Sequence, residues 1–177
     1  MRHANIVLLV IVLATFYSEW ILSIEIIPER TEVTYVNEKY LYNVSARVIR
    51  YGRKSDYLYN LEGGIKHTWG NNITIHFVFF EAQNNQYKRS LLEIKLKYCD
   101  LFQRDQYLGK MLSAILDKYG VSCPFAPGMY RFLNVTLPGE NIPNFMPFRK
   151  GKVEATFNQL QTQDLVARIF AIFTVKS

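Results

Sequence analysis

Three asparagines stand in the Asn-x-Ser/Thr triplet that accepts an N-linked glycan on the side-chain amide. They are Asn43, Asn72 and Asn134, and each lies in a run where apolar and polar residues alternate. Chance would supply about one such triplet in a chain of this composition. Because a glycan must point to water, each asparagine predicts which face of its strand is outside.

The residues of opposite parity to these asparagines are predicted to point inward. They are Tyr42, Val44, Ala46 and Val48 around Asn43, Ile73, Ile75, Phe77 and Phe79 around Asn72, and Leu133, Val135 and Leu137 around Asn134. All of them are apolar or aromatic. The pattern therefore predicts a β-rich shell around a large apolar interior.

The chain has two cysteines, Cys99 and Cys123. In an oxidising compartment an isolated pair most simply forms one disulfide. The loop that it closes holds about 25 residues, which is worth about 3 kcal/mol in the chain-entropy model. Neither His67 nor His76 lies at ligand spacing to a cysteine, so we expect no metal site and no cofactor.

The remaining reactive residue types form no catalytic pattern. The sequence shows no nucleophile elbow, no phosphate-binding glycine loop and no signal for a nucleophile beside a base. His76 shares the parity of Asn72 and is predicted to point to solvent, and His67 lies beside Trp69 with no acid or nucleophile near it in sequence. We therefore expect a protein that is not an enzyme.

The N-terminus has the pattern of a secretory signal peptide. Arg2 and His3 precede a run of eleven residues, 6–16, which are all apolar except Thr15. That run is too short for a bilayer span, which needs about 20 residues, but it suits a cleaved signal. We expect residues 1–23 to be a signal peptide, with an uncleaved anchor as the alternative, and residues 24–177 to form one secreted domain.

The net charge and the aromatic content indicate which classes of partner the chain could bind. The formal net charge is +6, and the basic residues are scattered in groups such as 47–54 and 88–97. On a secreted strand protein this is more typical of a solvated face than of a nucleic-acid site, with an anionic surface or lipid headgroup as the alternative. Twelve Tyr and twelve Phe make the chain unusually aromatic. Aromatic residues favour strands and apolar ligand surfaces.

The elements that must carry these residues are mostly strands. Alternation predicts strands over residues 31–50, 57–61, 65–69, 72–81, 87–98, 129–137, 152–161 and 165–176. Between them, apolar residues recur at helical spacing over 107–119 and Gly120 follows as a stop. Seven or eight antiparallel strands with one α-helix predict a mainly β fold, an immunoglobulin-like sandwich or cup.

An ordered set of short motifs surrounds the cysteines. It comprises Tyr98-Cys99-Asp100-Leu101-Phe102, Cys123-Pro124-Phe125, Gly128-Met129-Tyr130 and Pro143-Asn144-Phe145-Met146-Pro147. From about residue 32 onward the chain resembles a family of small secreted insect proteins, the chemosensory A and B proteins and their relatives without an assigned function. The resemblance implies an MD-2-related, GM2-activator-like cup that binds lipids between two sheets. It also implies a role in the perception of hydrophobic contact pheromones. Relatives often carry more than the one cysteine pair found here.

Two functions from different classes follow. In the first, inward residues wall a site for a lipid or hydrocarbon, and residues 138–148 form its rim. The predicted lining is Ile73, Ile75, Phe77, Phe79, Leu133, Val135, Ile169, Ala171 and Phe173, with Leu112 and Ile115 of the helix. Burial of ligand surface would drive binding at roughly 25 cal/mol per Å2. The alternative for the same residues is an ordinary packed core.

The second function is an interaction module that acts on a membrane receptor or ion channel without a small ligand. Its contact surface would be exposed aromatic residues in the 57–59 strand and in the 143–148 loop. The basic residues would then steer association.

Overall fold

The computed structural model describes residues 25–53, 55–106, 108–137 and 149–176. The predicted signal peptide and the 138–148 loop therefore lie outside the described residues. The elements in chain order are β1 (Glu25–Val36), β2 (Leu41–Ile49), β3 (Leu58–Ile65), β4 (Ile73–Gln83), β5 (Gln86–Lys97), α2 (Tyr98–Arg104), α3 (Leu108–Lys118), β6 (Gly128–Val135), β7 (Lys150–Gln159) and β8 (Leu165–Lys176).

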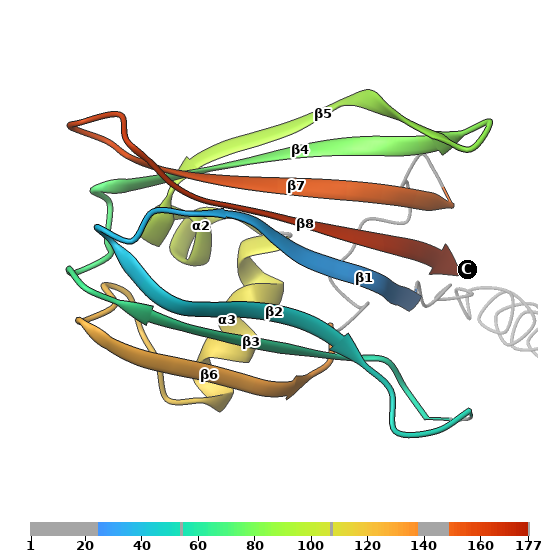
Figure 1. Cartoon of the computed structure of the whole chain (residues 1–177), viewed down its shortest axis with the longest axis horizontal. Helices are drawn as coiled ribbons and strands as arrows, with labels where there is room; N and C mark the ends of the chain where they lie inside the picture. The colour runs from blue at the N-terminus through green and yellow to red at the C-terminus, as the bar shows by residue number, and fades with distance from the viewer. Residues whose placement is uncertain (1–24, 54, 107, 138–148, 177) are drawn as a thin grey trace, which may run out of the picture.

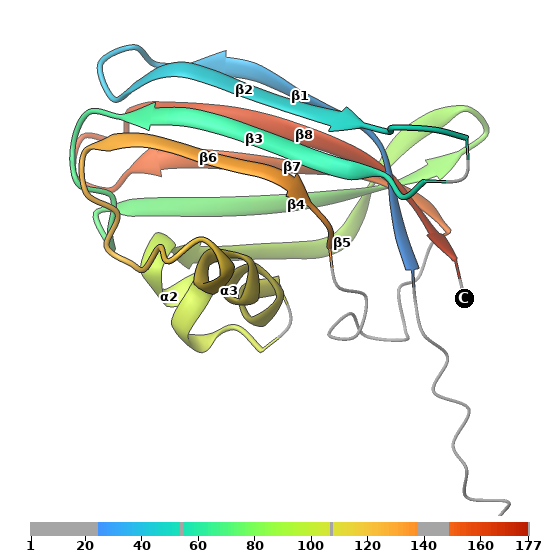
Figure 2. The same cartoon turned by 90° about the horizontal axis from the view of Figure 1, so that it is seen from below.

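The strands form two antiparallel sheets that face one another. The larger sheet has the order β1-β8-β7-β4-β5 and the smaller sheet the order β2-β3-β6. On one side of the molecule β1 and β2 lie next to each other, and on the opposite side the two helices lie between the edge strands β5 and β6 (Figures 1 and 2). This arrangement confirms the predicted mainly β, antiparallel sandwich or cup.

Most strands occur where alternation predicts them, with two corrections. The long run 31–50 is two strands, because the chain turns over residues 37–40. The two short runs 57–61 and 65–69 are replaced by the single strand β3, and Trp69 instead forms an isolated bridge with Phe125. Local alternation did not reveal the break between the two strands or the continuity of β3.

The predicted helix is α3, and its stop is confirmed. Gly120 adopts a φ of +63°, the left-handed conformation that ends many helices and that glycine adopts without steric cost. Before α3 lies a second helix, α2, which the sequence did not predict: the expected strand 87–98 reaches only its first residue, Tyr98. The apolar residues Tyr98, Leu101 and Phe102 have helical spacing, which was the available signal.

The start of α2 is stabilised by a residue distant in sequence. The backbone N–H groups of Cys99 and Asp100 both donate to Oδ1 of Asn71, at 3.1 and 3.2 Å. The Asn71 amide in turn donates to the Asp100 carboxylate. Asn71, which lies in the β3–β4 connection, thus accepts hydrogen bonds from backbone amides that would otherwise be unpaired at the N-terminus of this helix. The predicted disulfide between Cys99 and Cys123 is confirmed, and it joins this first turn to the chain after α3.

The end of the sandwich formed by residues 37–40, 66–72 and 160–164, called here the closed end, contains the main core. Its buried residues are Tyr40, Leu41, Ile65, Trp69, Ile73, Leu116, Phe125, Val166 and Ala167. Aromatic rings surround Tyr98, with Trp69, Phe102 and Phe125 at centroid distances of 5.3, 5.1 and 5.4 Å. Such edge-on pairs are the favoured geometry of packed aromatic residues.

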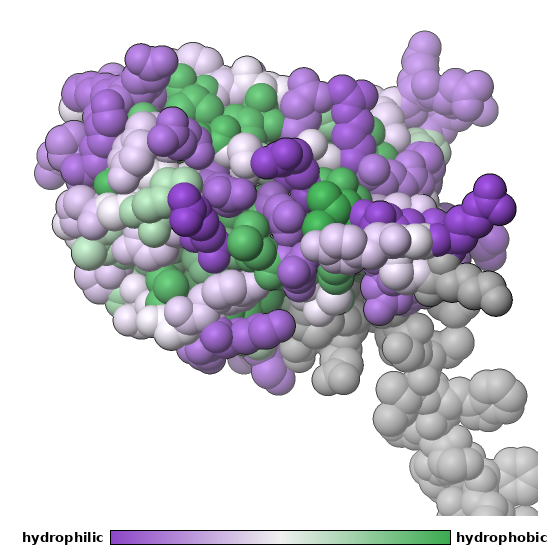
Figure 3. Space-filling model, turned by 60° about the horizontal axis from the view of Figure 1, so that its bottom comes forward, coloured by the Kyte–Doolittle hydropathy of each residue, from purple (hydrophilic) through white to green (hydrophobic). Residues whose placement is uncertain are grey.

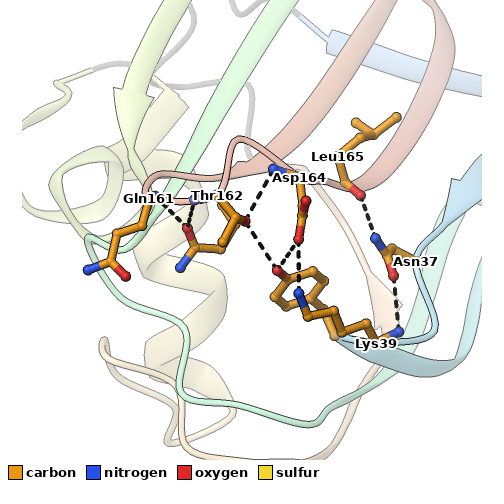
Figure 4. A network of polar contacts seen from close by, with 8 residues as sticks. Asn37, Lys39, Gln161, Thr162, Asp164 and Leu165 are labelled. Carbon is orange, nitrogen blue, oxygen red and sulfur yellow. Dashed lines mark hydrogen bonds and ion pairs between the residues drawn. The ribbon is translucent and has the colours of Figure 1, made fainter.

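Polar contacts join two turns at the closed end (Figure 4). The buried Tyr40 donates its hydroxyl hydrogen to the Asp164 carboxylate at 2.5 Å, and the Lys39 ammonium lies 3.1 Å from the same oxygen. Asn37 donates from its side chain to the carbonyl of Leu165 and from its backbone to that of Val166. These contacts connect the β1–β2 turn to the β7–β8 turn.

Acid should weaken the fold through three carboxyl groups. The pKa of Asp164 is lowered mainly by the Tyr40 hydroxyl, that of Glu93 by His76 and Arg89, and that of Glu29 by Lys150 and Thr174. Since these pKa values are lower in the folded than in the unfolded chain, their stabilisation is present above about pH 4.5 and is lost as the pH falls through the folded values.

Denaturant unfolding between about pH 7 and pH 3 measures this loss. We expect the free energy of unfolding to fall with acid and Asp164→Asn to show a smaller fall. An equal fall in both proteins would contradict the role of Asp164.

Candidate ligand-binding site

The inner face of the larger sheet can be read from its strand register. Residues paired across antiparallel strands share a face. The pairs Val33–Ile169, Ile169–Ala155, Ala155–Phe77 and Phe77–Ile94 therefore form one row across all five strands, called here the middle row. Ile75 and Phe79 flank Phe77 on β4, so the parity predicted from Asn72 is correct: these residues face the smaller sheet and Asn72 is exposed.

Burial along this face is uneven. Ile75 and Phe79, on either side of the middle row, are each 3% exposed. In contrast, all five residues of the middle row are only half-buried. Ala155 lies on β7, the central strand, so its exposed surface cannot arise from an open sheet edge. The middle row is therefore less completely covered than Ile75 and Phe79, whereas a fully packed core would bury all of these residues.

The predicted lining residues fall into a buried group and a half-buried group. Ile73, Ile75, Phe79, Val135 and Phe173 are buried, and Phe77, Leu112, Ile115, Ile169 and Ala171 are half-buried. Small side chains contribute to the incomplete filling, since Ala155 and Ala171 face the interior from neighbouring strands. Ala155, Val33 and Ile94 were absent from the sequence prediction, although the alternation of their strands contained the signal.

For two of the three asparagines, the residues predicted to point inward do not all do so. Asn43 and Asn134 adopt φ values of +49° and +56°, and each lies at an irregularity in strand pairing, where one strand carries extra residues. An extra residue reverses the parity of the chain on its two sides. Consequently Tyr42 and Leu133, predicted to point inward, are 36% and 42% exposed. Val44, Ala46, Val48, Val135 and Leu137 remain buried or half-buried.

The smaller sheet and α3 complete the interior. The pairs Ala46–Leu61 and Leu61–Phe132 place an apolar row on its inner face. From α3, Met111 is buried against half-buried residues of both sheets: Ile26 and Val175 in the larger sheet and Leu137 after β6. Met111 was not among the predicted lining residues, but it belongs to the same helical stripe as Leu112 and Ile115.

A groove of about 370 Å3 lies at the end opposite the closed end, called here the open end. Its lining comes from both sheets and comprises Glu25, Ile26, Ile27, Pro28, Arg50, Ser55, Asp56, Tyr57, Thr136, Leu137 and Lys176. Arg50 stacks 4.6 Å over the ring of Tyr57 and donates to the Tyr57 hydroxyl and to the carbonyl of Ser55. The open end thus has an apolar interior side and a charged rim of both signs. A further groove of about 330 Å3 lies beside Asn43.

The outer faces carry exposed apolar and aromatic residues at other positions than the sequence predicted. Tyr59 is buried and Tyr57 is half-buried, so the expectation of exposed aromatic residues at 57–59 was wrong. On the side that carries β2, β3 and β6, apolar and polar side chains are interspersed (Figure 3). The exposed Tyr42, Met129 and Leu133 belong to this face. The 143–148 loop lies outside the described residues.

The histidines lie away from the interior. His76 is on the outer face of β4, where its Nε2 lies 3.0 Å from the Glu93 carboxylate, and His67 is exposed. Within the described part of the chain, no group of three or more His, Cys, Asp or Glu side chains could hold a metal ion. No helix in that part is long and apolar enough to cross a membrane.

Comparisons with known proteins show one partial family match and one similar fold. Residues 75–151, less than half of the chain, match the model of a family described as "Protein of unknown function (DUF1091)". The sequence matches no curated protein. Among solved structures, the fold is similar to that of chicken MD-1 complexed with lipid IVa, with 14% identity over 88% of this chain and 91% of that chain. The TM-score of 0.37 is too low for this likeness to indicate a ligand.

Proposed function

We propose that the chain is a secreted protein that binds a hydrophobic ligand between its two sheets and is not an enzyme. The middle row supports this proposal, because its five inward apolar residues are only half-buried, although Ile75 and Phe79, on either side of Phe77, are buried. Apolar surface that a protein leaves open in its interior gains free energy when a ligand covers it, at roughly 25 cal/mol per Å2. In this proposal the ligand enters at the groove of the open end, whose lining comes from both sheets.

The ligand that we propose is a lipid or a cuticular hydrocarbon, acting as a contact pheromone in insect chemosensation. The motifs around Cys99 and Cys123 support this finer assignment through the resemblance described above. An apolar wall selects by length and shape rather than by charge, which suits long-chain hydrocarbons. Mass spectrometry of material that co-purifies with the secreted, glycosylated protein would identify the class.

Displacement of a fluorescent lipid probe by long-chain hydrocarbons tests binding directly. Saturable displacement is expected. If the protein neither binds the probe nor retains co-purified lipid, the alternative gains support: a module that acts on a membrane receptor or channel through its outer surface.

Two alanines on the inner face provide a matched pair of variants. Ala155 is half-buried in the middle row, whereas Ala167 is 2% exposed in the closed-end core. We expect Ala155→Leu to change the free energy of unfolding by less than about 0.5 kcal/mol and to weaken probe binding, because leucine occupies space that the ligand needs. Ala167→Leu should cost about 1–3 kcal/mol by overpacking.

Denaturant unfolding and probe titration of both variants check this prediction. An equal destabilisation by the two substitutions would mean that the middle row is packed as tightly as the closed end, and it would overturn the proposed function.

A further inference from the structure

The hydroxyl group of Tyr59 is a polar atom inside an otherwise apolar region. Tyr59 is 7% exposed, and its cross-strand neighbours on the same face are Val48 and Val135. Two residues away on the same face, Tyr57 lines the groove at the open end, and Leu61 lies in the other direction beside Phe132. Tyr59 therefore lies between the groove and the centre of the interior.

This hydroxyl has no hydrogen-bond partner among the described residues. It differs from Thr31 Oγ1 and Trp69 Nε1, which are unpaired and fully enclosed, so it retains contact with open space. Burial alone raises the pKa of Tyr59, which means that no neighbouring charge or hydrogen bond stabilises its ionised form. Most buried hydroxyl groups in proteins are paired with protein or with ordered water, so this hydroxyl is open to a partner from outside the chain.

Tyr40 shows the usual arrangement in the same molecule. It is equally buried, at 7% exposed, but its hydroxyl donates to Asp164 and lies 3.3 Å from Thr162. A tyrosine that served only to fill the interior at position 59 would gain nothing from its hydroxyl group, and phenylalanine would suffice.

We propose that the Tyr59 hydroxyl hydrogen-bonds to the oxygen of a neutral ligand, such as a long-chain ester, alcohol, ketone or aldehyde. This inference rests on the proposed function, since it assumes that the interior holds a ligand. A neutral ligand fits because the residues around Tyr59 on this face are apolar, and a charged group placed among them would be unpaired. The guanidinium of Arg50, which lines the groove, is already bonded to Ser55, Tyr57 and Arg53.

The test compares ligands that differ only in their polar end. A long-chain n-alkane and the methyl ester, primary alcohol and free acid of matched chain length each displace a fluorescent lipid probe from the full glycosylated protein. Tyr59→Phe should weaken binding of the ester and of the alcohol by roughly 3- to 10-fold, and it should leave binding of the alkane unchanged or slightly tighter. Tyr98→Phe is the matched control, because its hydroxyl is also unpaired among the described residues but lies in the closed-end aromatic cluster.

Stability gives a second readout. Tyr59→Phe removes no protein hydrogen bond, so the ligand-free variant should unfold at the same or a higher denaturant concentration than the original protein. Tyr40→Phe should unfold at a lower one.

Several results would overturn the inference while leaving the proposed function intact. One is that Tyr59→Phe weakens binding of the alkane and the ester equally, or does not weaken binding of the ester. Another is that Tyr98→Phe weakens binding of the ester as much as Tyr59→Phe does. A third is that the free acid binds most tightly and Tyr59→Phe has no effect on its binding. Failure of the original protein to bind any of the probes would overturn the proposed function, and the inference with it.

Discussion

Replacing Gly109 with alanine is expected to destabilise the protein by at least about 3 kcal/mol, at the upper end of overpacking effects. A Cβ atom at position 109 would lie 1.8 Å from the carbonyl oxygen of Leu101 and 2.9 Å from Cβ of Asp105. The first contact is with backbone, so no side-chain rotation relieves it. The N-terminal turn of α2 is held by the disulfide and by Asn71, which limits any retreat of this helix.

Gly120→Ala is the control for this prediction. Gly120 also has a special role, with a φ of +63°, but an added Cβ would meet nothing within 4 Å. Alanine there should cost only about 1 kcal/mol through its left-handed backbone. Denaturant unfolding followed by circular dichroism compares the two variants. Equal costs would show that α2 and α3 can separate freely, against the close packing described here.

Removing the disulfide is the second large effect that we expect. The double substitution Cys99→Ala, Cys123→Ala should lower the free energy of unfolding by about 3 kcal/mol, because the crosslink closes a long loop in the unfolded chain. The separation of the two residues is 24. The loop contains α3 and all of α2 but its first residue, so its release also affects Met111, which packs against Ile26, Val175 and Leu137.

Thermal and denaturant unfolding, with and without a reducing agent, measures this contribution. The reduced original protein and the double variant should have the same stability, and the reducing agent should not affect the variant. Unchanged stability of the double variant would mean that packing alone holds the helices, which would contradict the role given to the crosslink.

The two predictions depend on the same region, and this region was the least well predicted from the sequence. The pairing of Cys99 with Cys123 followed from their being the only two cysteines. The helix that carries Cys99 was missed, because seven residues give little periodic signal and their N-terminal amides are satisfied by Asn71, which is distant in sequence. The apolar stripe of α3 is longer, and it was sufficient to predict that helix.

The strands show the same contrast between long regular patterns, which were predicted correctly, and local irregularities, which were not. The property concerned is which residues of a strand point inward. Around Asn72 the alternation is uninterrupted, and the inward direction of Ile73, Ile75 and Phe79 was correct. Around Asn43 and Asn134 the left-handed backbone adds residues to one strand of a pair and moves Tyr42 and Leu133 outward. Asparagine tolerates this conformation better than most residues, so its presence in a strand was a signal for a bulge as well as for a glycan.

The amino-acid sequence by itself determined most of the strands, the main helix, the cysteine pair and the apolar character of the interior, because these depend on local periodicity and residue type. Only the tertiary structure decided where strand pairing is interrupted, which helix end is satisfied by a distant side chain, and how completely the inward residues fill the space between the sheets. How completely side chains fill the interior depends on the distance between the two sheets, whose strands come from separate parts of the sequence. The half-burial of Phe77 between the buried Ile75 and Phe79 therefore follows from packing and not from sequence pattern.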